Sequence, residues 1–193
     1  IDIIEPVEQL ETKLKMINYK ILSIAQTLSS DVISGELMLN TCQFIKGSNE
    51  KIQENGTTLF LNVAAANGRP NRWIKNTPNI KPGDITLTLD GTTGLVNKSL
   101  EGFNGYLQKV VSNKYTSAEI YFSLLKPENQ TIIKMNETGT TIKHSPNSKK
   151  QLKIYKFKNK EELENIFKQS LLIETYLPKV IKLKEKMIDL LVK

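Results

Sequence analysis

The chain has 193 residues, of which 27 are basic and 20 acidic, and its net charge is +7 at pH 7. This length allows one domain with its own hydrophobic core. The sequence has no apolar run near the ~20 residues of a membrane span, and its single cysteine excludes an internal disulfide framework and favours the reducing cytoplasm. The excess positive charge predicts an acidic partner, either nucleic acid or an anionic membrane surface.

The positive charge is concentrated in the middle of the chain. Residues 1–30 carry three basic and four acidic side chains, residues 31–160 carry eighteen and ten, and residues 161–193 carry six of each. A protein of the membrane surface would be expected to place its lysines on an amphipathic terminal helix. The distribution therefore favours nucleic acid, and no membrane, as the partner.

Residues 1–30 are predicted to form a long helix. Apolar residues recur there at alternating spacings of three and four, which is the heptad pattern of a coiled coil. The heptad residues are Val7, Leu10, Leu14, Ile17, Ile21, Ile24 and Leu28. The alternative is an ordinary amphipathic helix on a globular core, but the apolar face of such a helix is usually broader than this narrow seam.

Residues 159–193 are predicted to form a second helix of the same kind. Asn159 and Glu162 resemble a capping box at its start, and Pro178 predicts a kink or a fresh helix start. The heptad residues are Ile173, Tyr176, Val180, Leu183, Met187 and Leu190, and a second apolar stripe consists of Leu177, Ile181, Ile188 and Leu191. A helix with two apolar sides packs against more than one neighbour.

The simplest arrangement pairs these two helices as an antiparallel coiled coil. The predicted interface residues are Leu10, Leu14, Ile17, Ile21 and Ile24 on the first helix and Val180, Leu183, Met187 and Leu190 on the second. The outer face of the pair would then be free for a second copy of the chain or for another subunit.

The middle segment, residues 31–158, has the periodicity of strands instead. Strands are predicted at residues 59–63, 85–89, 106–111, 132–135 and 151–157, and a helix is predicted at residues 118–125. Clusters of glycine, proline and asparagine separate these elements. Many short strands with one or two short helices predict a mixed α+β domain.

Three polar loops of the middle segment are candidate DNA-binding sites. The first contains Asn67, Arg69, Asn71, Arg72 and Lys75, the second contains Thr92, Thr93, Asn97 and Lys98, and the third contains Lys143, His144, Lys149 and Lys150. Arginine pairs well with guanine and asparagine with adenine, and both also bind phosphate. Each loop alone could be solvated surface, but three such loops within the basic segment favour nucleic acid as the partner.

Motifs of catalysis and metal binding are missing from the sequence, which has no P-loop, HExxH, GxSxG or CxxC pattern. His144 is the only histidine, which argues against a zinc site. Asp84 and Asp90 are conceivable metal ligands of a nuclease, but no acidic-x-Lys partner follows them closely. We instead expect Asp84 to complete a turn and Asp90 to order the loop of residues 91–94 through an Asx-type hydrogen bond.

Several features of the chain occur together in a known family. They are the strand and loop GDITLTLDGTTG at residues 83–94, the segment GTTIKH at residues 139–144 with the lysine-rich strand after it, and the two flanking heptad helices. In these features the chain resembles one half of the specificity (S, or HsdS) subunit of type I restriction–modification systems. It departs from the family at residues 157–163, FKNKEEL, where a Pro-rich segment ending in Glu-Gln is common.

The resemblance implies a fold and a role for each part of the chain. Residues 1–30 and 159–193 would be spacer helices, and residues 31–158 would be a DNA target recognition domain that reads one half of a bipartite sequence in double-stranded DNA. Such a subunit is not an enzyme; it docks methyltransferase (modification) and restriction subunits. S-adenosylmethionine, ATP and magnesium are expected only in those partners. The chain would be either a fragment or a half-subunit that dimerises.

The leading hypothesis is therefore a sequence-specific, non-catalytic DNA-binding subunit. In this hypothesis lysines attract phosphates, whereas Arg69, Asn71 and Arg72, with Thr92 or Thr93, read bases. Two alternatives stay open. One is an interaction scaffold whose coiled coil binds a protein partner and whose domain is incidentally basic, and the other is a nuclease that depends on Asp84.

Overall fold

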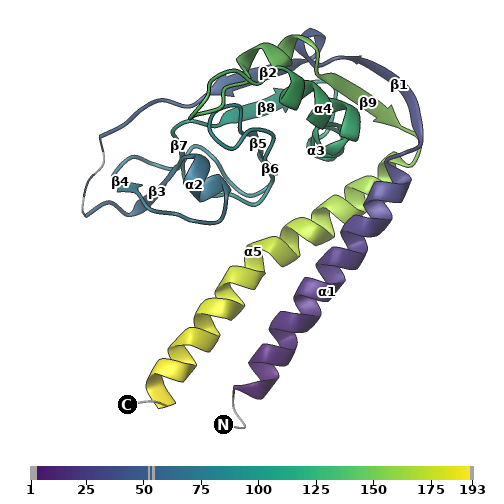
Figure 1. Ribbon diagram of the computed structural model, residues 1–193. Coiled ribbons are helices and arrows are strands. Elements are labelled where there is room, and N and C mark those ends of the chain that lie inside the picture. The colour runs from purple at the N-terminus through teal and green to yellow at the C-terminus, as the bar shows by residue number, and fades with distance from the viewer. Residues whose placement is uncertain (1–3, 52, 54, 192–193) are drawn as a thin grey trace.

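Two long helices carry a mixed α+β domain at one end (Figure 1). The computed structural model describes residues 4–51, 53 and 55–191. Helix α1 (Glu5–Leu28) leads into the domain and helix α5 (Lys160–Leu191) leaves it, so the two helices run antiparallel and end together far from the domain. The predicted α+β class and the pairing of the flanking helices are both confirmed. No described helix is long and apolar enough to cross a membrane.

Three small sheets of the described residues build the domain. Their strand orders are β1-β9, β2-β8-β5-β6 and β4-β3-β7. The strands are β1 (Val32–Leu37), β2 (Cys42–Lys46), β3 (Thr58–Leu61), β4 (Trp73–Ile74), β5 (Ile85–Leu87), β6 (Val96–Asn97), β7 (Phe103–Asn104), β8 (Gln108–Ser112) and β9 (Lys153–Phe157). The helices between them are η1 (Met38–Asn40), α2 (Val63–Ala66), α3 (Ser117–Leu125), α4 (Pro127–Met135) and η2 (Pro146–Lys150). All neighbouring strands pair antiparallel except β3 and β7, which are parallel.

Helix α3 is the centre of the larger core. Ile120 and Leu124 are buried in the same cluster as Leu87, Val110 and Ile154 from the strands around them. A capping box between Thr116 and Glu119 starts this helix, because each side chain bonds to the backbone N–H of the other residue. A second, smaller core lies under α2 and β3 and contains Leu61, Ala65, Ala66, Ile80 and Leu107. The loops of the candidate site are thus held by two cores rather than one.

Most predicted elements of the domain are present with shifted ends. The helix at 118–125 is α3, and the strands at 59–63, 85–89, 106–111 and 151–157 correspond to β3, β5, β8 and β9. The strand predicted at 132–135 is wrong, because these residues form the last turn of α4. An apolar run of four residues does not distinguish strand from helix. Pro127 lies in the first turn of α4, a position that proline favours, so it is the residue in the sequence that indicates a helix here.

The predicted seam of the helix pair is only half correct. Leu14 and Ile21 are partly buried, whereas Leu10, Ile17 and Ile24 are 47%, 48% and 55% exposed. The buried stripe of α1 is displaced by about one residue from the predicted seam. Glu11, Asn18 and Ala25 occupy the buried or partly buried positions that were predicted for Leu10, Ile17 and Ile24. On α5, Val180 and Met187 are partly buried, but Leu183 and Leu190 are 53% and 77% exposed.

Polar contacts explain the rotated seam. Lys184 of α5 lies 2.7 Å from Glu11, and the Ser170 hydroxyl donates to Asn18 Oδ1 at 2.7 Å. Leu177 and Ile181, which belong to the second apolar stripe of α5, are partly buried. Helix α5 also runs through Pro178 as one helix, so of the two predicted alternatives, a kink or a fresh helix start, the fresh start is wrong. A pattern search that counts only apolar residues cannot find a seam that contains Glu11 and Asn18.

Candidate nucleic-acid interface

One cleft of about 410 Å³ brings the three predicted loops together. Its lining combines the start of α2, the first loop, the loop after β5, and the third loop. The lining residues are Val63, Ala64, Asn67, Arg69, Gly91, Thr92, Thr141, Ile142 and Lys143. Segments that are separated by more than 70 residues in sequence therefore form one surface. The cleft is the candidate site.

A short helix and its cap place the first loop. Asn62 caps α2 by accepting a hydrogen bond from Ala65 N at 2.9 Å, and its amide donates to Asn71 Oδ1 at 3.1 Å. After the helix, Arg69 N donates to Ala64 O at 2.8 Å. These bonds fix the backbone, while the side chains of Asn67 and Arg69 stay exposed at the cleft.

The second loop is a tight turn that projects from β5. Thr88 Oγ1 donates to Thr92 O at 2.5 Å and accepts from Leu95 N at 2.9 Å, so this buried hydroxyl closes the turn. Gly91 has a φ of +72° and donates its N–H to Lys143 O at 2.8 Å. A positive φ favours glycine there. The predicted Asx bond of Asp90 is therefore replaced by the Thr88 hydroxyl.

The third loop is a five-residue projection with a fixed base. Thr138 and His144 exchange backbone hydrogen bonds of 2.8 and 2.9 Å across its neck. His144 Nδ1 also lies 2.6 Å from Asp90 Oδ1, which ties the neck to the second loop. Lys46, at the end of β2, is 3.9 Å from the other oxygen of Asp90. Asp90 thus binds two neighbours across the domain and is committed to holding the site together.

Charge at the cleft is positive and largely uncompensated. Arg69 and Lys143 line it, and both are exposed. Neither residue, nor Arg72 or Lys75 nearby in sequence, takes part in an ion pair among residues 4–51, 53 and 55–191. Free cations beside backbone turns are what phosphate binding requires. The exposed apolar side chain of Ile142 lines the same cleft. Apolar side chains can contact the methyl group of thymine.

Other predicted residues lie near the cleft but do not line it. Asn71, Arg72 and Lys75 are exposed on the chain that leads into and out of β4, where Arg72 O accepts a hydrogen bond from Phe60 N at 2.9 Å. Lys150 is exposed on η2, and Lys149 Nζ lies 5.9 Å from the ring centre of Phe44. Arg72, Lys75 and Lys150 add exposed positive charge outside the cleft.

Lys46 belongs to this surface and was not predicted. Phe44 and Lys46 stand two residues apart on β2, so they share one face of the strand. Lys149 lies over Phe44, and Lys46 reaches Asp90, which places both lysines along the side of the site. The only signal in the sequence was a lysine at the end of the apolar run CQFIK, and such a signal is too common to single out.

Three predicted DNA-binding residues are not free for DNA. Thr93 is 4% exposed, and its hydroxyl bonds to Glu137. Lys98 is 1% exposed and lies 2.5 Å from Glu174 of α5. Asn97 is partly buried in β6, where it pairs with Thr86. Thr93 and Lys98 are buried by these partners, whereas Asn97 is held in the strand.

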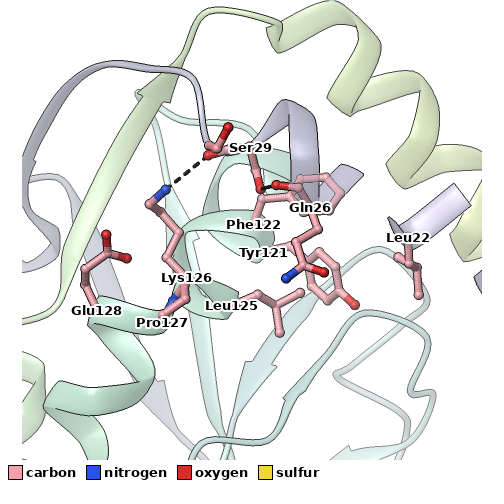
Figure 2. A pocket seen from close by; sticks show the side chains of 10 residues that line it. Leu22, Gln26, Ser29, Tyr121, Phe122, Leu125, Lys126, Pro127 and Glu128 are labelled. Carbon is pink, nitrogen blue, oxygen red and sulfur yellow. Dashed lines mark hydrogen bonds between the residues drawn. The ribbon is translucent and has the colours of Figure 1, made fainter. Parts of the chain in front are cut away.

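A larger cavity lies elsewhere in the molecule. It measures about 620 Å³ and is formed where the end of α1 meets α3 and the start of α4 (Figure 2). Lys126 at its rim donates to Ser29 O at 3.1 Å and is 5.1 Å from the centre of the Tyr155 ring. None of the three polar loops lines this cavity. We therefore keep the smaller cleft as the candidate site, on chemical rather than size grounds.

The carboxylates of Asp84 and Asp90, the conceivable metal ligands of a nuclease, are engaged in contacts within the fold. Asp84 accepts from Lys81 N at 3.0 Å and from Lys109 Nζ at 2.8 Å, so it completes a turn as expected. Among the residues whose positions are described, no three His, Cys, Asp or Glu side chains cluster as metal ligands would. Cys42 is buried, and burial raises the pKa of its thiol, as expected for a packing residue.

Comparison with solved structures identifies the fold. The S subunit of a type I restriction–modification system from M. genitalium aligns with a TM-score of 0.55 at 18% identity, over 70% of this chain and 37% of that one. The HsdS subunit from Thermoanaerobacter tengcongensis aligns with a TM-score of 0.50 at 14% identity, over 97% of this chain and 55% of that one. A chain from a structure of complex assembly and conformational transition in the type I R-M system gives 0.50 at 15%, over 97% and 55%.

These alignments confirm the predicted resemblance at the level of the fold. The chain spans about 37% to 55% of the length of the S subunits with which it aligns. No protein-family model and no curated protein matches its sequence. The division into parts 1–30, 31–158 and 159–193 stays a prediction.

Proposed function

We propose that this chain is the DNA-recognition module of a type I restriction–modification specificity subunit. It reads one half of a bipartite target through the cleft, and it does no chemistry itself. The observation that carries the proposal is the convergence of three polar loops, two of which bring a cation, Arg69 and Lys143, on one cleft in a chain with the fold of S subunits. A chain that spans about half of such a subunit fits one recognition domain with its pair of spacer helices.

The residues of the cleft take different roles in this proposal. Lys143, with Lys46, Lys149 and Lys150 along the side, attracts phosphates, because an ammonium acts as a point charge. Arg69 reads a base, since its planar guanidinium forms two hydrogen bonds with guanine. Asn67 and Thr92 add further polar contacts from neighbouring loops. Arg72 and Asn71 stay candidates at the edge of this surface.

Salt dependence of DNA binding tests the role of Lys143. DNA affinity falls with salt in proportion to the number of phosphates that a protein neutralises. Lys143→Ala is expected to weaken binding to duplexes of random sequence and to lower the slope of log K against log salt by about 1. The matched control is Lys20→Ala, which removes the same charge from the exposed face of α1. Anisotropy titrations in which both variants keep the wild-type slope would contradict the proposal.

The helix pair supplies the docking surface for partner subunits. Leu10, Ile17 and Ile24 on α1, with Leu183 and Leu190 on α5, are exposed although they keep heptad spacing. Exposed apolar residues in a regular stripe mark an interaction surface. We propose methyltransferase and restriction subunits, or a second copy of the chain, as occupants of this stripe.

The same stripe keeps an interaction scaffold as the second candidate function. A pure scaffold would use the stripe and leave the cleft idle. Ile17→Lys is expected to prevent self-association in sedimentation measurements, or to prevent a methyltransferase from co-purifying with the chain. It is expected to leave DNA affinity unchanged. If Ile17→Lys leaves every complex intact, the stripe is not a docking surface.

Cofactors belong to the partners in this proposal. The chain binds none, and S-adenosylmethionine, ATP and magnesium are held by the methyltransferase and restriction subunits. The compartment is the cytoplasm, where such systems meet incoming DNA. The assignment of the cofactors and that of the compartment both follow from the proposed role.

A further inference from the structure

A buried cation lies at the junction of the domain and the helix pair. Lys98 follows β6 and is 1% exposed, although it is charged and belongs to a loop sequence that reads as surface. Its Nζ lies 2.5 Å from Glu174 Oε1, 3.4 Å from the Tyr121 hydroxyl and 4.6 Å from the centre of the Tyr121 ring. Burial lowers the pKa of Lys98 and raises that of Tyr121. This lysine plays no part in the cleft.

The partners of Lys98 join three parts of the molecule. Glu174 Oε1 accepts from Asn18 Nδ2 of α1 at 3.4 Å and from Ser170 Oγ of α5 at 3.2 Å, in addition to Lys98 of the domain. Asn18 and Ser170 are also bonded to each other at 2.7 Å. One carboxylate therefore connects the recognition domain, α1 and α5.

Helix α5 is weakened at this same turn. Pro178 has no N–H, so the carbonyl of Glu174 lacks its usual partner four residues ahead. Bends of long helices concentrate at such points. A helix that is free to bend at residues 174–178 would let the domain swing relative to the helix pair, unless a contact fixes it there.

Stability alone does not explain an ion pair whose lysine is buried while the Glu174 side chain stays 25% exposed. The cost of removing the lysine charge from water commonly offsets its attraction to the carboxylate, and a well-packed apolar pair is often as stable. The best-attested advantage of such buried polar contacts is a unique arrangement, because an apolar contact tolerates many orientations. The position of Lys98 at a three-way junction suits that role.

We propose that Lys98 is a positioning residue, which fixes the angle between the recognition domain and the helix pair through Glu174. Lys126 makes the corresponding contact with α1, because its ammonium group donates a hydrogen bond to Ser29 O at the end of that helix (Figure 2). If the proposed function is correct, this angle sets the distance between the half-site read by the cleft and the half-site read by a second domain. Only that last step rests on the proposed function.

Distance measurements between spin labels test the inference on the whole chain. Labels at Thr131→Cys on α4 and Lys186→Cys on α5, in a Cys42→Ser background, report the position of the domain relative to the helix pair; both label sites are exposed. In the double variant Lys98→Met, Glu174→Leu the distance distribution is expected to broaden about twofold, because the apolar pair no longer selects one orientation. The control Lys114→Met breaks an exposed ion pair with Glu36 and should leave the distribution unchanged.

A second variant covers the case in which the double variant does not fold. Glu174→Gln keeps the size of the side chain but removes its charge, and it is expected to broaden the distribution as well. If the ion pair only stabilised the fold, the variants would have a lower unfolding midpoint but a distance distribution of unchanged width. Wild-type widths in Glu174→Gln, or in a folded double variant, would overturn the proposal.

DNA binding separates this inference from the proposed function. Lys98→Met, Glu174→Leu should keep the affinity for a single duplex half-site within about threefold, because the cleft itself is intact. If the wild-type chain binds no duplex at all, the proposed function fails, while the label distances still decide whether Lys98 positions the domain.

Discussion

At the residue scale, the cleft combines a rigid backbone with free cationic side chains. Gly139 has a φ of +90°, and a Cβ there would stand 2.3 Å from Ile142 O, so only glycine fits the neck of the third loop. Asp90 binds His144 and is within 4 Å of Lys46, which joins that loop to its neighbours. Lys143 is then presented on a fixed frame. Rigid presentation lowers the entropy cost of ordering a loop on DNA.

Lys98 and Lys143 show what residue type alone leaves open. Both are lysines in polar loops of the basic segment, and both were predicted to bind DNA. One is exposed at the cleft, whereas the other is buried against Glu174. The difference depends on a partner 76 residues away in sequence, which no local pattern contains.

At the element scale, the helix pair depends on polar contacts within an apolar frame. Glu11 is 9% exposed and contacts Lys15 of its own helix and Lys184 of α5. Hydrogen bonds from Lys15 and then Lys184 hold the pKa of Glu11 below its usual value. Because the folded pKa is lowered, the stabilising effect is present above the unfolded value near 4.5 and is lost as the pH falls through the folded pKa.

Acid unfolding measures the effect of Glu11. Glu11→Gln is expected to lose less stability than the wild type between about pH 5 and pH 3, because the wild type must protonate a paired carboxylate. Urea unfolding at each pH gives the comparison. Glu8→Gln removes an exposed carboxylate from the same helix and serves as the control. If Glu11→Gln and the wild type lose the same stability over this range, the pairing contributes nothing.

At the scale of the whole molecule, the sequence predicted the architecture better than the surfaces. Heptads and a charge map were sufficient for two helices around a basic α+β domain, because both signals extend over many residues. The seam of α1 was rotated in the prediction, since Glu11 and Asn18 find their partners on α5, more than 150 residues away. The convergence of the three loops likewise depends on strand pairing, for example β2 with β8, that no single stretch encodes.

The central claim is that the cleft reads DNA sequence, and Arg69 tests it most directly. Duplexes selected from a random pool by the wild-type chain are compared with scrambled duplexes in anisotropy titrations. Arg69→Ala is expected to lose ~1–3 kcal/mol on the selected duplex and to relax specificity at one base position, while Lys20→Ala changes neither. Equal affinity of wild type and Arg69→Ala for selected and scrambled duplexes would contradict the account.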